Sequence, residues 1–84
     1  MITDKKWVEG NGEHYTAHAD YDFNAGSEQE LSFRAGQTLR LAPRAMQPRI
    51  KGWLLAATDR QHVGLVPANY IKILAKHDGT SIST

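Results

Sequence analysis

The sequence predicts an all-β fold, a small barrel built from five short strands. Its 84 residues allow one domain at most. In several short stretches apolar residues alternate with polar ones, which is the period of a half-buried strand. Proline and glycine fall between these stretches, where they favour turns and loops. No stretch has the length of a substantial helix and no internal repeat is present, so we expect short strands that close into a barrel.

The first three strands are expected over residues 15–19, 37–41 and 53–56. A long loop, residues 24–36, joins the first two strands, and its apolar residues return to the core at period two. Residues 42–52 contain two prolines and a glycine, so they are predicted to be a loop without an element of its own.

The last two strands are expected over residues 62–66 and 71–74. Pro67 has no backbone N–H for a sheet hydrogen bond, so the fourth strand ends there, and one short 3-10 turn precedes the last strand. Alternation along the strands gives the predicted core. Its members are small or apolar: Ala17, Ala19, Leu31, Phe33, Leu39, Leu41, Ala56, Val66 and Ile71.

Composition separates the expected domain from its two ends and excludes several functions. Residues 1–13 are interpreted as an N-terminal linker, residues 14–75 as the domain, and residues 76–84, rich in glycine, serine and threonine, as a flexible tail. The net charge is +1 and there is no cysteine. The near-neutral charge therefore gives no reason to expect a nucleic-acid binder, and the absence of cysteine excludes thiol redox chemistry. No apolar run approaches the roughly 20 residues of a membrane span, and no secretory signal is recognisable.

The histidines and hydroxyl residues give no sign of an enzyme. His14 and His18 are four positions apart, a metal-binding spacing only on a helix, and they fall on a predicted strand, so we interpret them as two solvated side chains. No serine, histidine and aspartate set stands out for nucleophilic work. We expect no catalytic residue, no metal and no cofactor.

Four motifs follow one another in an order that few folds explain. They are Ala19-Asp20-Tyr21-Asp22-Phe23, Glu30-Leu31-Ser32-Phe33, the lone Trp53, and Gly64-Leu65-Val66-Pro67-Ala68-Asn69-Tyr70. In this order the sequence resembles the SH3 domains. The resemblance implies a five-stranded SH3 barrel with a long RT-type loop, and a function as a peptide-binding module.

SH3 domains bind proline-rich peptides, whose polyproline II helix repeats every three residues and fits between flat aromatic side chains. The resemblance implies a peptide-binding groove lined by nine residues: Tyr21, Phe23, Glu28, Glu30, Trp53, Leu65, Pro67, Asn69 and Tyr70. Glu28 and Glu30 would bind an Arg or Lys of the ligand. Phe23 replaces a tyrosine and Leu65 an aromatic residue common in the family, which makes the groove greasier and less directional.

Further residues narrow the resemblance to the SH3 domains of the animal peroxin-13 family. These are Trp7, Ser32-Phe33-Arg34-Ala35-Gly36 and the loop that ends Gly52-Trp53-Leu54-Leu55-Ala56. The resemblance implies a parent protein anchored in the peroxisomal membrane, with a role in matrix protein import. The implied partners are proline-rich or aromatic-motif peptides of peroxin-14 and of the cargo receptor peroxin-5, with no direct membrane contact by this fragment.

Other functions remain open at this point. Arg44, Arg49 and Lys51 stand near Trp53 and superficially resemble a basic patch with a stacking aromatic, as in single-stranded nucleic-acid binders. Acidic residues expected to face the same groove, Glu28 and Glu30 among them, would repel phosphate, so we expect no nucleic-acid partner. The domain is alternatively an SH3 adaptor of another scaffold or signalling protein, or an autoinhibitory module bound by its own chain.

Overall fold

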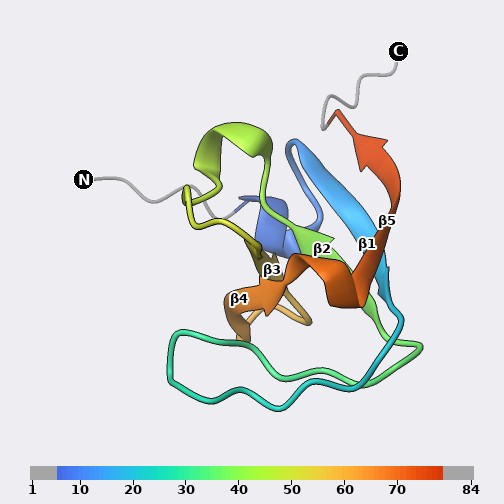
Figure 1. The fold of residues 1–84 in the computed structure, drawn as a ribbon. Helices are drawn as coiled ribbons and strands as arrows, with labels where there is room; N and C mark the ends of the chain where they lie inside the picture. The colour runs from blue at the N-terminus through green and yellow to red at the C-terminus, as the bar shows by residue number, and fades with distance from the viewer. Residues whose placement is uncertain (1–5, 79–84) are drawn as a thin grey trace.

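Five antiparallel strands form one curved sheet in the computed structural model, which describes residues 6–78. The strands are β1 (His14–Ala19), β2 (Thr38–Leu41), β3 (Trp53–Ala57), β4 (Val63–Pro67) and β5 (Ile71–His77). Their order in the sheet is β4-β3-β2-β1-β5, so the first and last strands are neighbours (Figure 1). The predicted all-β class and the five strands are confirmed.

Three single 3-10 turns complete the described part of the chain: η1 (Lys6–Glu9), η2 (Arg44–Met46) and η3 (Ala68–Tyr70). The predicted turn after Pro67 is η3. The prediction that residues 42–52 hold no element was wrong, because η2 begins at Arg44, directly after Pro43, and the backbone N–H of Met46 donates to the Pro43 carbonyl oxygen (2.9 Å). None of the helices within residues 6–78 has the length and hydropathy needed to span a membrane.

The main core lies inside the curved sheet and consists of the nine predicted residues. Period two found them because β1 and β2 pair in register, Ala17 opposite Leu39, so both side chains point to the same face. Burying one leucine or phenylalanine side chain stabilises a domain by about 1.5–3 kcal/mol. A thin core of this kind therefore depends on each of its few large side chains.

The segment before β1 is packed, in contrast to the free linker expected over residues 1–13. Trp7 and Val8 of η1 are only 4% and 3% exposed. They form a second cluster with Ala42 and Ala57, and Met46 and Leu55 pack against it. A lone tryptophan exposes much apolar surface, and the small side chains of Ala42, just after β2, and Ala57, in β3, leave room to bury it. Residues 1–5 of the expected linker lie outside the described part.

The other end of the chain is also more regular than expected, because β5 continues to His77 beyond the predicted end at residue 74. Thr16 pairs with Ala75 and Ala17 with Ile73, so Leu74 is an extra residue, a β-bulge after which pairing with β1 resumes. The expected tail, residues 76–84, thus begins inside β5. Residues 79–84 lie outside the described part.

His14 is not solvated, contrary to the interpretation of His14 and His18. It is 6% exposed, and its ring stacks on that of His77 with 4.6 Å between ring centroids. Its Nδ1 donates to the Gly12 carbonyl oxygen (2.9 Å). The two histidines face each other because His14 and His77 are partners in the β1–β5 ladder.

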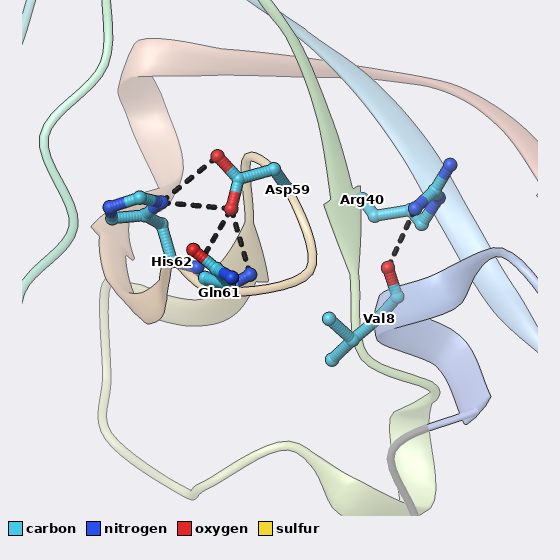
Figure 2. A network of polar contacts seen from close by, with 5 residues as sticks. All are labelled: Val8, Arg40, Asp59, Gln61 and His62. Carbon is cyan, nitrogen blue, oxygen red and sulfur yellow. Dashed lines mark hydrogen bonds and ion pairs between the residues drawn. The ribbon is translucent and has the colours of Figure 1, made fainter.

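The turn between β3 and β4 is organised by one carboxylate. Asp59 Oδ1 accepts hydrogen bonds from the backbone N–H groups of Gln61 (2.8 Å) and His62 (3.0 Å), and it also contacts His62 Nδ1 (2.8 Å) (Figure 2). The His62 side chain and the Gln61 N–H favour the ionised carboxylate and lower the pKa of Asp59 below its ordinary 3.8.

Because the pKa of Asp59 is lowered, the free energy of unfolding is predicted to decrease slightly at acid pH. Because the folded pKa is below the unfolded one, the stabilisation is present above pH 3.8 and is lost as the pH falls through the folded pKa. Asp59→Asn keeps a side-chain acceptor for the turn but removes the charge. We expect the stability difference between wild type and Asp59→Asn, measured by urea unfolding, to shrink below pH 3.8. A constant difference from pH 7 to pH 3 would contradict this.

Candidate functional site

Four aromatic side chains from three separate segments meet on the surface and are called here the aromatic cluster: Tyr21, Phe23, Trp53 and Tyr70. The Tyr70 ring lies edge-on to Tyr21 (centroids 5.4 Å apart) and to Phe23 (5.8 Å), and Phe23 in turn lies edge-on to Trp53 (5.9 Å). Edge-to-face pairs at these distances are favourable, and they keep neighbouring rings from stacking flat on one another.

The fold brings these rings together through backbone pairing. The N–H of Asp20 donates to the Tyr70 carbonyl oxygen (2.8 Å), which places the segment after β1 beside η3. Trp53 opens β3 directly opposite Pro67, the last residue of β4. Phe23 exchanges two backbone hydrogen bonds with Phe33 (2.9 and 3.0 Å). The rings are thus carried by the start of β3, by the paired loop after β1 and by η3.

The cluster is partly exposed and partly supported by the core. Tyr21 is 58% exposed, and Asn69 in η3 is also exposed. Phe23 and Tyr70 are half-buried and pack against the main core, so they have both a structural and a surface role. Pro67 is buried, whereas Trp53 and Leu65 are half-buried. All nine residues predicted for the site lie in the described part, and the four aromatic ones are contiguous.

Residues 20–36 of the long loop between β1 and β2 are called here the acidic loop, and its own side chains brace it. Asp22 Oδ1 accepts from the Ala35 N–H (2.8 Å), and Ser32 Oγ accepts from the Ala25 N–H (2.8 Å). Near the tip, Glu30 Oε1 accepts from the Gly26 N–H (2.7 Å). The Glu30 carboxylate therefore also shapes the loop, a role that the sequence analysis did not anticipate, whereas Glu28 is exposed.

The tip of the acidic loop rests on β4. The Leu65 N–H donates to the Gln29 carbonyl oxygen (2.8 Å), and the Leu31 N–H donates to the Leu65 carbonyl oxygen (2.9 Å). Gly64 makes this approach possible, because a Cβ atom there would lie 2.9 Å from the Gln29 carbonyl oxygen. Glu30 and Leu65 form an isolated bridge, so a candidate charge and a candidate apolar residue are adjacent.

The loop between β2 and β3, residues 42–52, is called here the basic loop and carries the exposed Arg44, Arg49 and Lys51. Figure 1 shows it on the opposite side of β3 and β4 from the acidic loop. The side chain of Gln47 fastens it to β3. Gln47 Nε2 donates to the carbonyl oxygens of Ala42 (3.0 Å) and Leu55 (3.1 Å), and Gln47 Oε1 accepts from the Leu55 N–H (2.7 Å).

The arrangement offers apolar area and charge for binding. Within residues 6–78 no three His, Cys, Asp or Glu side chains gather as a metal-binding group. The surface itself presents aromatic side chains, with an acidic and a basic loop on its two sides. A peptide with spaced apolar residues and a charged end has matching features.

The comparisons with known proteins agree with this geometry. Residues 19–72 match the family model described as "Variant SH3 domain". The chain belongs to the SH3 domain family. By structure it is similar to the C-terminal SH3 domain of myosin IB from Entamoeba histolytica, bound to a peptide, with a TM-score of 0.60 and 27% identity over 71% of this chain and 92% of that one.

Among curated proteins the chain is similar to peroxisomal membrane protein PEX13 of several animals. It is 54% identical to the protein of Bos taurus over 79 residues, and 53% identical to that of Homo sapiens over the same length. Each match covers 93% of this chain and 20% of the relative. For Caenorhabditis elegans the identity is 55% over 73 residues, 86% of this chain and 22% of the relative. The chain thus spans about a fifth of the length of these relatives, and the similarity to them extends over most of its own length.

Proposed function

We propose that this chain is the peptide-binding SH3 module of a peroxisomal membrane protein that takes part in matrix protein import. Its ligands are proline-rich or aromatic-repeat segments of peroxin-14 and of the cargo receptor peroxin-5. The observation that carries the proposal is the aromatic cluster, in which Tyr21, Phe23, Trp53 and Tyr70 lie edge-to-face at 5.4–5.9 Å. The similarity to animal PEX13 at 53–55% identity supports the peroxisomal setting.

The chemistry of the cluster favours a broad ligand class. A proline-rich peptide needs flat ring walls and hydroxyl groups that bond its carbonyl oxygens. Tyr21 and Tyr70 supply such hydroxyls, whereas Phe23 and Leu65 supply only apolar area. An amphipathic helix satisfies its own backbone hydrogen bonds, so apolar area suffices for it. We therefore propose that aromatic side chains spaced along a helix dock on the same surface.

Competition tests this proposal directly. A labelled proline-rich peptide of peroxin-14 and an aromatic-repeat peptide of peroxin-5 are titrated against each other by fluorescence anisotropy. We expect both to bind and each to displace the other. In the double variant Phe23→Tyr with Leu65→Tyr, the balance should shift toward the proline-rich peptide. Binding of both peptides at once would overturn the shared surface, and binding of neither would favour an SH3 adaptor of another kind of protein.

The acidic loop predicts a charge preference in the ligand. Glu30→Gln removes the charge but keeps the acceptor for the Gly26 N–H, whereas Glu30→Lys removes both. We expect Glu30→Gln to weaken ligands with a flanking Arg or Lys by up to about fivefold at low salt, the usual range of an exposed ion pair. The loss should fade as salt rises, and Glu28→Gln should act similarly.

A neutral ligand is the control for these charge variants, and its affinity should not change. Calorimetric titration at two salt concentrations separates the cases. Equal weakening of basic and neutral ligands by Glu30→Gln would mean that the residue acts only by shaping the loop.

A further inference from the structure

The second buried cluster joins the N-terminal segment to the basic loop. Trp7 and Val8 come from η1, Ala42 begins the basic loop, and Ala57 ends β3. Met46, in the middle of the basic loop, packs against the same cluster. The cluster is separate from the main core, so its burial fixes the position of the basic loop relative to the sheet and adds little to the closure of the barrel.

Two polar contacts hold this arrangement in place. Arg40 of β2 reaches across to η1, where its Nη1 donates to the Val8 carbonyl oxygen (2.7 Å) (Figure 2). On the loop side, Gln47 makes its three hydrogen bonds to Ala42 and Leu55, both of which touch the cluster. Half-buried polar groups bonded in this way are costly to separate, because each would lose its partner.

Through β3 and the basic loop, the second cluster is connected to Trp53 of the aromatic cluster. Leu55 and Trp53 lie on one face of β3, since side chains two apart share a face. The basic loop ends at Gly52, whose carbonyl oxygen accepts from the Ala68 N–H of η3 (2.8 Å). Trp53 follows directly, and its N–H donates to the Ile50 carbonyl oxygen of the loop (3.1 Å). The loop is thus held at one end by the second cluster and at the other by residues beside Trp53.

From this geometry we infer that η1 is a positioning element for the ligand surface, which it acts on through the basic loop without touching ligand. Trp7 and Val8 hold Ala42, Met46 and Leu55, and Gln47 then fixes the loop against β3. A loop fixed in this way presents Arg44, Arg49 and Lys51 in one place and loses less entropy when a ligand binds. The inference rests on the proposed function for its effect on affinity, but its effect on the loop is independent of any ligand.

Amide hydrogen exchange and peptide titration on matched variants test this inference. Trp7→Ala removes the ring, and Trp7→Phe restores most of the apolar area. Leu39→Val destabilises the main core without touching the second cluster and is the control for stability alone. In Trp7→Ala we expect faster exchange of the Leu55 and Trp53 amides, while the amides of β1 exchange no faster than in Leu39→Val.

The affinity measurement uses the proline-rich and aromatic-repeat peptides at a temperature where every variant is folded. We expect Trp7→Ala to weaken binding about fivefold, as expected when a binding loop must be ordered on docking. Trp7→Phe should recover most of the affinity and Leu39→Val should keep it. Should Trp7→Ala fail to fold, Val8→Ala takes its place with the same expected order of effects.

The outcomes separate this inference from the proposed function. Loop exchange in Trp7→Ala equal to that in Leu39→Val would overturn the positioning role whether or not a peptide binds. Selective loosening of the loop together with unchanged affinity would overturn it as well. If the wild type binds neither peptide, the proposed function fails, and selective exchange at Leu55 and Trp53 would still support the coupling of η1 to the loop.

Discussion

Trp53→Ala should abolish measurable peptide binding while the domain stays folded. The Trp53 ring belongs to neither buried cluster, and its ring contact is with Phe23 at the surface. Truncating an aromatic anchor of this kind typically costs at least about 2 kcal/mol of binding free energy, roughly 30-fold in affinity. Calorimetric titration measures the loss, and a thermal melt shows whether the fold is retained.

The matched control for Trp53→Ala is Leu74→Ala. Leu74 is also a large apolar side chain, 58% exposed, but it lies on β5 as the extra residue of the bulge. Its removal should leave affinity unchanged. The opposite outcome would be the loss of the thermal unfolding transition in Trp53→Ala, with normal affinity of the fraction that remains folded. It would mean that Trp53 supports the barrel and that the ligand surface lies elsewhere.

Gly64→Ala should displace the tip of the acidic loop and destabilise the domain. The new Cβ atom would lie 2.9 Å from the Gln29 carbonyl oxygen and 3.0 Å from the Glu30 carbonyl carbon. These are backbone atoms that no side-chain rotation can move, so the loop must shift away from β4. Overpacking of this kind costs about 1–3 kcal/mol of unfolding free energy. Urea unfolding measures it, and faster amide exchange at Leu31 and Leu65 locates it.

The control for Gly64→Ala is Gly26→Ala, in the acidic loop itself. At Gly26 a Cβ atom would meet only Glu30 Oε1, at 3.4 Å, which is ordinary contact with the end of a flexible side chain. Gly26→Ala should therefore change stability much less and leave the Leu31 and Leu65 amides protected. If both variants behaved alike, the close approach at Gly64 would have no special importance.

What the sequence predicted well depends on period-two alternation. The nine residues of the main core lie either on strands or in loop segments that return to the sheet. Alternation alone therefore assigns them to the inner face of the sheet. The resemblance to SH3 domains implies that the four aromatic residues lie together, and their rings are in contact. Their role in binding a ligand remains a proposal.

What the sequence could not show depends on packing between segments far apart in the chain. Trp7 is buried because Ala42 and Ala57 leave space for it, and no local pattern links these three positions. The extension of β5 depends on a bulge, at which alternation changes phase. The hydrogen bonds of Gln47 require that the basic loop fold back on β3, which its composition does not reveal. Of these features, only the burial of Trp7 had a sign in the sequence, since a tryptophan in a linker would leave a large apolar surface in water.

The pairing of the first strand with the last has a consequence for synthesis. Because β5 lies beside β1, the sheet closes only when the end of the domain has left the ribosome, which adds about 5–20 residues per second. Tyr70 immediately precedes β5, so a chain that stops before η3 has Tyr21, Phe23 and Trp53 but no ring to join Tyr21 to the others. Under the proposed function, a peptide ligand is therefore expected to bind only copies whose synthesis has passed Tyr70.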